Sequence, residues 1–379
     1  MAAIKKMDFF PQSFYPQDRP AIIGMTESIC GQMGRMGTIK VSDNEHFIDG
    51  VPLLEWGKWR DCTYAGSVTV LFNTIGINAT YEQIMGLSAS AFRFAMNEQW
   101  DPAATMLQIG INSEDNCNRC FGVEVYEVED RRIRDYQVMC SIRDGIPILI
   151  CGGRCAPEWG LIAGYQFGDE NPLFYGRSYF DYQGALREDV YTSNQYFLAD
   201  RYPGVYPTDL FRLYNRNCPK RPWEEAVRVS LEAAMLMFQQ KSSPLYHYGY
   251  DAYELAAAGI ESDRYSNLRH HFSALLDARR AAYIYLAECS RGLAGEKQSL
   301  LALASARYKE MFDTLSDVLP YRELNQGKYN DGMTVTHRRK LAKALRRMSQ
   351  LEQLARRPIG ELLDRWNERI SSDRIRADT

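Results

Sequence analysis

The sequence predicts an α+β domain over residues 1–215, followed by an all-helical bundle domain over residues 216–379. Three observations predict this division. The chain has 379 residues, which is more than one average domain. Its composition changes near residue 220, from glycine, proline, tyrosine and short β-type runs to patterns typical of helices. In the first part, predicted helices precede a succession of short strands, which is typical of an α+β domain.

Residues 62–75 form the first predicted helix, with Asp61 as its cap and Gly76 as its stop. Apolar residues recur from Ala65 to Phe72 at the spacing of one helix face. We therefore expect this helix to bury one side and to begin at or next to Cys62.

A second helix is predicted to begin at Thr80, because Thr80 and Gln83 have the spacing of a capping box. Short β-type runs follow further along the chain and predict four strands. These strands cover residues 123–128, 146–151, 161–167 and 173–179.

The second part carries three apolar stripes at helical spacing, which predict the core of a helix bundle. The stripes begin at Val227, Phe272 and Leu301. Residues 336–379 contain 12 basic and 6 acidic residues. This basic segment indicates either a surface for RNA or an acidic partner, or a solvated helix face with arginines extended along it. The second interpretation is favoured, because no aromatic residues for base stacking are interleaved.

Composition narrows the function classes. The net charge is −3, so no global charge excess attracts nucleic acid or an anionic membrane. The longest apolar runs are too short to span a bilayer, and the N-terminal segment lacks the pattern of a secretory signal. Nine scattered cysteines indicate reduced thiols. We therefore expect a cytoplasmic protein.

The strongest chemical signal is Cys62 at the start of the first predicted helix. Unpaired backbone N–H groups and the helix dipole at that place favour a thiolate, which makes a nucleophile. The same N–H groups can hold a tetrahedral oxyanion. From the residues alone, the alternative is a half-buried structural cysteine.

Three segments resemble the N-terminal domain of the butirosin-biosynthesis acyltransferase family, which belongs to the papain-like clan of cysteine peptidases. They are DCTYAG at 61–66, YEQIMGLSASAFR at 81–93 and EWGLIAGY at 158–165. The resemblance covers roughly residues 40–185. More weakly, residues 251–260 and 276–286 resemble the C-terminal region of such proteins. The resemblance implies a papain-like fold for the first domain.

The resemblance also implies roles for individual residues. The nucleophile falls on Cys62, and the histidine that activates it falls on or next to Glu158. The acid that orients this histidine falls on Asp181. The glutamine that often completes the oxyanion hole falls on Trp56.

Glu158 therefore stands where the clan has its base, and this departure leaves three alternatives. A carboxylate of ordinary pKa is a weak base for a thiol, so Glu158 can share a proton usefully only if burial near Trp159 raises its pKa. Alternatively, a histidine from elsewhere enters the site, with His46 the nearest in sequence. In the third alternative, the chemistry is lost and the cleft binds a small molecule.

The five histidines are interpreted as follows. His46 is expected at the surface of a polar loop. His247 lies in an aromatic segment that is typical of either a ligand pocket or a domain interface. His270, His271 and His337 are expected to face solvent.

No cofactor is predicted. A structural zinc site is a less favoured alternative, and its candidate ligands are Cys117, Cys120, Cys151 and Cys155.

The predicted function is cysteine-dependent acyl transfer, or amide or thioester chemistry, on a small molecule or carrier-bound acyl group. The predicted catalytic residues are Cys62, Glu158 and Asp181. The predicted substrate-binding residues are Tyr64, Trp56, Trp159 and His247. The helical domain is expected to form one wall of the cleft, a homodimer surface, or both. The alternative function is a non-catalytic member of the same fold that binds a ligand or partner in the cleft.

Overall fold

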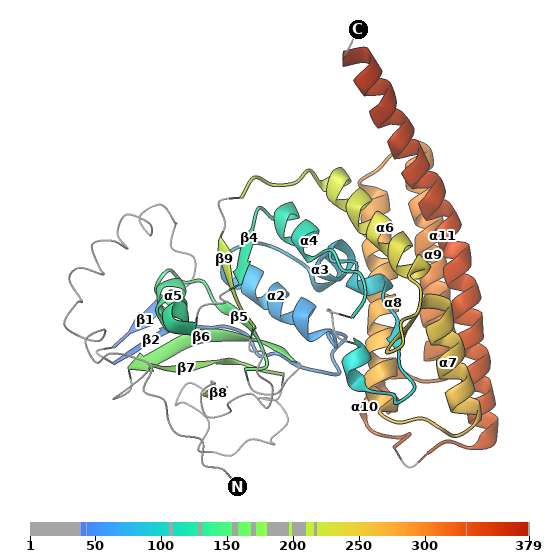
Figure 1. Ribbon diagram of the computed structural model, residues 1–379, viewed down its shortest axis with the longest axis horizontal. Helices are drawn as coiled ribbons and strands as arrows, with labels where there is room; N and C mark the ends of the chain where they lie inside the picture. Colours follow the sequence, from blue (N-terminus) through green and yellow to red (C-terminus); the bar gives the residue numbers. More distant parts are fainter. Residues whose placement is uncertain are drawn as a thin grey trace.

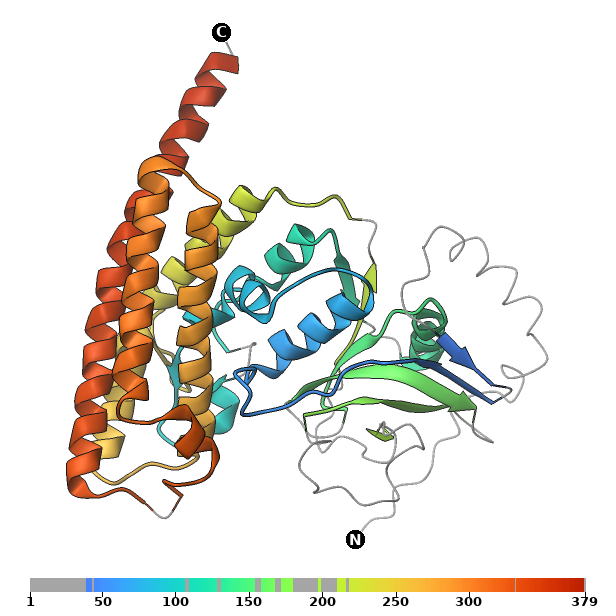
Figure 2. The same ribbon diagram turned by 180° about the vertical axis from the view of Figure 1, so that it is seen from behind.

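A computed structural model of the chain describes residues 39–377, except for residues 43, 106–108, 128–130, 154–157, 168–171, 180–196, 199–209, 216–217 and 331. The fold is α+β, with an antiparallel sheet and a helical C-terminal part. In Figures 1 and 2 the sheet lies at one end of the molecule and the long C-terminal helices at the other. Helices α2, α3 and α4 lie between them.

The sheet is organised around β6 (Trp159–Phe167), the longest of the described strands. One edge of β6 pairs with β7 (Pro172–Arg177), and the other edge pairs first with β5 (Ile148–Cys151) and then with β2 (Glu45–Ile48). All these pairs are antiparallel, as the sequence predicted. The first seven residues of β6 are buried, because helices cover this part of the sheet.

Further strands complete the sheet. They are β1 (Ile39–Val41), β4 (Glu124–Glu127), β8 (Phe197–Leu198) and β9 (Leu210–Asn215). The order along the main path is β1-β2-β6-β5-β9-β4. The four strands predicted from the sequence correspond to β4, β5, β6 and β7. Strands β1, β2, β8 and β9 were not predicted.

Four helices belong to the sheet part. They are α2 (Thr63–Thr74), α3 (Tyr81–Leu87), α4 (Glu114–Cys120) and α5 (Arg131–Arg143). Helix α2 packs on β5 and β6, and its residues from Tyr64 to Phe72 are all buried. The predicted capping box of α3 is confirmed, because the side chains of Thr80 and Gln83 each accept from the backbone N–H of the other residue.

Two short 3-10 helices and a small two-stranded sheet follow α3. The 3-10 helices are η2 (Ser90–Phe92) and η3 (Pro102–Thr105), and the small sheet joins β3 (Ala95–Met96) to β10 (His247–Tyr248).

The helical part contains α6 (Trp223–Gln239), α7 (Gly249–Glu261), α8 (Leu268–Arg291), α9 (Gly295–Ser316), α10 (Tyr321–Asn325) and α11 (Val335–Ala377). The apolar stripes predicted for α8 and α9 are buried, including Phe272, Leu286 and Leu301. The predicted domain boundary, between residues 215 and 216, falls between β9 and α6. The division into domains 1–215 and 216–379 stays a prediction.

One buried ion pair holds four of these helices together. Arg279 of α8 is fully buried and contacts both carboxylate oxygens of Glu352 in α11, at 3.0 and 3.1 Å. Tyr253 of α7 donates to the same carboxylate at 2.8 Å, and Tyr308 of α9 lies 3.4 Å from it. Arg279 therefore belongs to a buried polar centre within the apolar stripe of α8.

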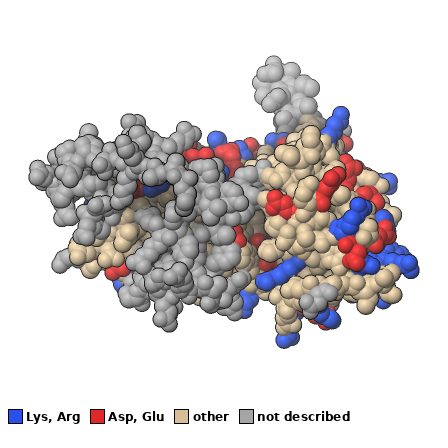
Figure 3. All heavy atoms as spheres, turned by 60° about the horizontal axis from the view of Figure 1, so that its bottom comes forward, with Lys and Arg blue, Asp and Glu red and all other residues tan. Residues whose placement is uncertain are grey.

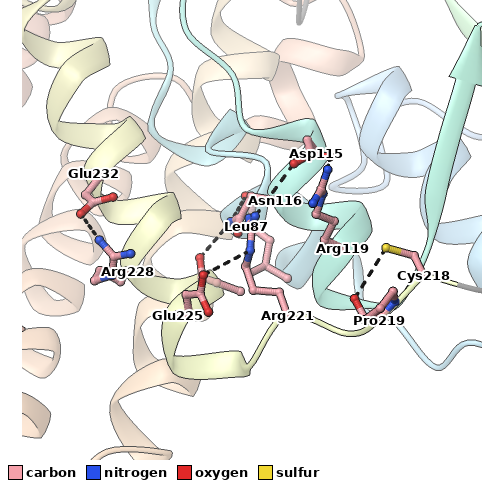
Figure 4. A network of polar contacts seen from close by, with 11 residues as sticks. Leu87, Asp115, Asn116, Arg119, Cys218, Pro219, Arg221, Glu225, Arg228 and Glu232 are labelled. Atoms are coloured by element: carbon pink, nitrogen blue, oxygen red, sulfur yellow. Dashed lines mark hydrogen bonds and ion pairs between the residues drawn. The ribbon is translucent and has the colours of Figure 1, made fainter. Parts of the chain in front are cut away.

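The two parts of the chain also contact each other closely through α3 and α8. A Cβ on Gly86 would lie 2.1 Å from the ring of Tyr285, so only glycine allows this packing. A second connection is drawn in Figure 4, where Asn116 of α4 donates to the carbonyl groups of Leu87 and Ala226 and accepts from Arg221. The side chain of Asn116 thus joins the ends of three helices.

The basic residues of α11 are balanced by acids on neighbouring helices. Arg346 pairs with Glu254 and Glu261 of α7, and Arg347 pairs with Glu310 of α9. On the face shown in Figure 3, basic and acidic side chains are interspersed over the helical part. These pairs favour the interpretation of α11 as a charged helix face rather than a nucleic-acid surface. Among the described residues, no helix has both the length and the apolarity to cross a membrane.

Candidate functional site

A cavity of about 350 Å³ lies where the start of α2, the start of β6 and one face of α8 meet. Five of the predicted site residues line it, namely Trp56, Cys62, Tyr64, Glu158 and Trp159. The α8 residues on its wall include Arg269, Ser273 and Ala278. The helical part therefore forms one wall of the cavity, as predicted.

Cys62 is the N-cap residue of α2, so the helix begins one residue later than predicted. The first turn of α2 is hydrogen-bonded to the start of β6. Thr63 Oγ1 accepts from the backbone N–H of Trp159 at 3.2 Å, and Ser67 Oγ donates to the carbonyl of Trp159 at 3.2 Å. These two bonds hold Cys62 and Glu158 on the same side of the cavity.

Opposing effects act on the Cys62 thiol. Burial raises its pKa above the ordinary value and is the largest effect. The Arg93 guanidinium and the backbone N–H groups of Ala65 and Tyr64 favour the thiolate. The net pKa is raised, so the expectation of a low thiol pKa at this helix start is wrong. Desolvation outweighs the helix terminus here.

Glu158 is a largely buried carboxyl group at the cavity wall. Burial raises its pKa to about 9, and no described residue forms a hydrogen bond with its Oε2 atom. At neutral pH the group is therefore mostly protonated. The Glu158 pKa of about 9 is close to the pKa of an ordinary thiol, near 8.5.

A pair of buried carboxyl groups lies behind Cys62. The backbone N–H of Cys62 donates to the Tyr81 hydroxyl at 3.0 Å, and this hydroxyl donates to Asp277 Oδ2 at 2.5 Å. Asp277 also accepts from the backbone N–H of Asp61 at 3.1 Å. Burial and the charge of Asp61 raise the pKa of Asp277 to about 8.

Asp61 does not cap α2, which corrects the prediction from the sequence. Its carboxylate instead accepts from the backbone N–H of Gly57 at 2.9 Å and from the Tyr321 hydroxyl at 2.6 Å. Tyr321 belongs to α10, so Asp61 connects the start of α2 to the helical part.

Two histidines from α8 line the cavity, whereas His46 does not. His46 lies in β2 and stacks on Tyr165, so its predicted loop position is wrong. His271 is only 1% exposed, which also contradicts the prediction, while His270 is exposed.

Other predicted residues lie elsewhere. His247 is in β10, pairs with Met96 and does not line the cavity. Asp181 lies outside the described residues. His337, in the first turn of α11, is half-buried, and its ring lies 5.2 Å from that of Tyr329.

The proposed zinc ligands are separated between elements. Cys117 and Cys120 lie in α4, Cys151 lies in β5, and Cys155 falls outside the described residues. Across the described residues, no group of three or more His, Cys, Asp or Glu side chains is arranged to hold a metal ion.

Sequence reasoning missed Arg93 and Asp277. Arg93, which stands between Phe92 and Phe94 in the sequence, lines the cavity. Asp277 is fully buried and stands two residues before Arg279. The available signal was a charged residue within an apolar run, which is rarely buried unless it has a partner or a role.

Comparison of the sequence with models of protein families finds no match, and no curated protein is similar to it at a significant level. The resemblance to the butirosin-biosynthesis acyltransferases therefore stays a prediction.

Proposed function

We propose that the chain has a papain-like arrangement and transfers acyl groups through a thioester on Cys62. The substrate class is a small molecule or a carrier-bound acyl group. The observation that carries the proposal is the shared cavity of Cys62, at the start of α2, and Glu158, at the start of β6. In the resemblance, these are the positions of the nucleophile and its base.

The raised pKa of Glu158 supplies the property that an ordinary carboxylate lacks. A carboxylate with a pKa of about 9 is a far stronger base than an ordinary carboxylate, so it is better able to accept a thiol proton. The ionised fraction of Glu158 is small at neutral pH and rises towards pH 9. We therefore expect an alkaline optimum.

In the proposed reaction, the ionised Glu158 accepts the thiol proton as Cys62 Sγ attacks the acyl carbonyl. The bond from the carbonyl carbon to the leaving group then breaks, and Glu158 returns the proton to that group. In the second half, an amine or water attacks the thioester carbonyl carbon and gives its proton to Glu158. The carbon–sulfur bond breaks, and Glu158 passes the proton to the Cys62 sulfur. The N–H groups of Tyr64 and Ala65 favour the thiolate throughout.

The test is acyl-enzyme formation. The protein is mixed with p-nitrophenyl acetate or an acetyl thioester at pH 9, quenched in acid and digested, and the Cys62 peptide is weighed by mass spectrometry. We expect an acetyl group on Cys62, and none on that peptide in Cys62→Ala. Failure to acylate Cys62 with either donor would contradict the proposal.

The second candidate is a cavity that binds a ligand without catalysis. The raised pKa of Cys62 favours this second candidate. It predicts slow labelling of Cys62 by iodoacetamide at every pH and no acyl-enzyme. Both candidates are consistent with a cytoplasmic protein with reduced thiols.

A further inference from the structure

Arg93 borders the cavity directly after η2. Its NH2 group donates to the Thr105 carbonyl at 2.5 Å. Its NH1 atom is buried and has no hydrogen-bond partner among the described residues. The carboxylate whose charge acts on Arg93 is that of Glu114, and Glu114 forms its ion pair with Arg212. One donor pair of this guanidinium is therefore unused.

Arg279, which is fully buried, shows how the same chain treats a buried cation when no ligand is involved. Arg279 is matched by Glu352, which contacts it through both carboxylate oxygens. Leaving a buried charge without such a partner is costly. Arg93 has no such contact with a carboxylate among the described residues, and it lines the cavity. Arg279, in contrast, is fully buried in the core of the helical part.

The acids of the cavity do not neutralise Arg93. Glu158 is mostly protonated at neutral pH, and the charge of Asp61 acts on Arg269 rather than on Arg93. A second arginine, Arg269, lies on the α8 wall of the same cavity. Among the described residues of the cavity, Arg93 is therefore left without an acidic partner. A planar guanidinium with free N–H groups is suited to a carboxylate or a phosphate.

We propose that Arg93 binds an anionic group, a carboxylate or a phosphate, on the small molecule that reaches Cys62. This inference rests on the proposed function only in taking Cys62 as the reacting group of the cavity. It narrows the substrate class to acyl donors or acceptors that carry such an anion close to the reacting carbonyl.

The test compares two alkylating reagents that differ in charge. Iodoacetate is an anion and iodoacetamide is neutral, and both react by the same step. The Cys62 sulfur forms a bond to the CH₂ carbon, the carbon–iodine bond breaks, and iodide leaves with the bonding electrons. The thiol proton passes to the buffer. Rates are measured on the Cys62 peptide by mass spectrometry, because other cysteines also react.

The measured quantity is the rate with iodoacetate divided by the rate with iodoacetamide. Because both reagents need the same thiolate, a change in the Cys62 pKa cancels from this ratio. We expect the ratio at Cys62 to exceed that of N-acetylcysteine. In Arg93→Gln it should fall about tenfold, the change expected for one charge-assisted hydrogen bond. An unchanged ratio in Arg93→Gln overturns the proposal.

Matched variants define the origin of the effect. Arg93→Lys keeps the charge and should keep much of the preference for iodoacetate. Arg228→Gln removes an arginine that pairs with Glu232 on α6, outside the cavity, and should leave the ratio unchanged. A tenfold fall in Arg228→Gln would show that overall charge, and not Arg93, sets the preference.

A protection experiment on the unaltered protein does not depend on the folding of any variant. Iodoacetamide labelling of Cys62 is measured with added inorganic phosphate or succinate, with potassium chloride to hold the ionic strength constant. Protection by phosphate alone indicates a phosphate ligand, and protection by succinate alone indicates a carboxylate. Labelling that neither anion slows contradicts the proposal.

The charge preference at Cys62 and the formation of an acyl-enzyme are tested separately, so either proposal can fail without the other. A charge preference at Cys62 without an acyl-enzyme identifies an anion-binding cavity that does not transfer acyl groups. An acyl-enzyme without a charge preference identifies acyl transfer from donors that Arg93 does not select.

Discussion

The hydroxyl group of Tyr81 donates to Asp277 at 2.5 Å and at the same time accepts the backbone N–H of Cys62 at 3.0 Å. One atom of α3 thus connects the start of α2 to α8. The candidate nucleophile is therefore positioned by a residue of the helical part, although no described atom of Asp277 borders the cavity.

Replacing Tyr81 by Phe should destabilise the fold. The change leaves the Cys62 N–H unpaired and removes one donor from the buried Asp277 carboxyl group. We expect a loss of about 1–3 kcal/mol, measured by urea unfolding. Tyr126→Phe is the control, because Tyr126 is an exposed residue of β4, and it should cost less than about 0.5 kcal/mol. Equal effects of the two changes would contradict the role of Tyr81.

The stability should fall as the pH rises from about 4 to about 8, because the pKa of Asp277 is raised in the folded state. Below pH 4, Asp277 is protonated in both the folded and the unfolded state, so it does not change the free energy of unfolding with pH. Between the two pKa values the unfolded chain loses the proton that the folded state retains, so unfolding becomes easier by up to about 1.4 kcal/mol per pH unit. Above pH 8 both states are ionised and the loss stops.

The Asp277→Asn variant isolates this group. It should flatten the dependence of the unfolding free energy on pH between 4 and 8, measured by urea unfolding at several pH values. Glu158 and Asp61 also have raised pKa values and add slopes of the same sign, so the informative quantity is the difference between variant and parent. The exposed Glu98 provides the control, and Glu98→Gln should keep the parent slope.

Glu158→Gln should slow the acetylation of Cys62 by p-nitrophenyl acetate about 100-fold at pH 9, because the base is removed while its shape is kept. In the parent protein the rate should rise with pH up to about 9, the pKa of Glu158, and the variant should lose this rise. The rate is followed by the release of p-nitrophenolate in single-turnover experiments. Equal pH profiles for parent and variant would exclude Glu158 as the base.

Glu352→Ala should be among the most damaging single changes in the helical part. It leaves Arg279 buried without its counter-ion, which costs about 3–5 kcal/mol. Glu310→Ala breaks the solvent-accessible pairs with Arg307 and Arg347 and should cost less than about 1 kcal/mol. The double variant Arg279→Met and Glu352→Leu removes both charges and should recover much of the loss. A double variant as unstable as Glu352→Ala would argue against this explanation.

Two glycine-to-alanine changes should have opposite signs in thermal unfolding. Gly86→Ala places a methyl group against the ring of Tyr285 and should cost about 1–3 kcal/mol. Gly360 lies inside α11, where the nearest atom to a new Cβ is 3.7 Å away. Gly360→Ala should stabilise the fold by up to about 1 kcal/mol, because alanine favours a helix. A Gly86→Ala protein as stable as the parent would show that α3 and α8 can separate without cost.

Local patterns in the sequence were sufficient for α3 and for the central strands. The capping box at Thr80 and Gln83 depends on residues three apart, and the apolar runs of β5 and β6 form one buried pair of strands. Strand β2 was missed because Glu45 and His46 look like loop residues. Its pairing with β6 overrides that local preference, and His46 stacks on Tyr165.

The sequence by itself determined the α+β class, the helical C-terminal part and the position of Cys62 at the start of a helix. These features depend on hydrophobic periodicity and on residues close together in the chain. Only the tertiary structure decided the protonation of the site and the presence of Arg93 and α8 residues in its cavity. Burial and contacts between residues as distant as Cys62 and Asp277 set these properties, and no local pattern encodes them.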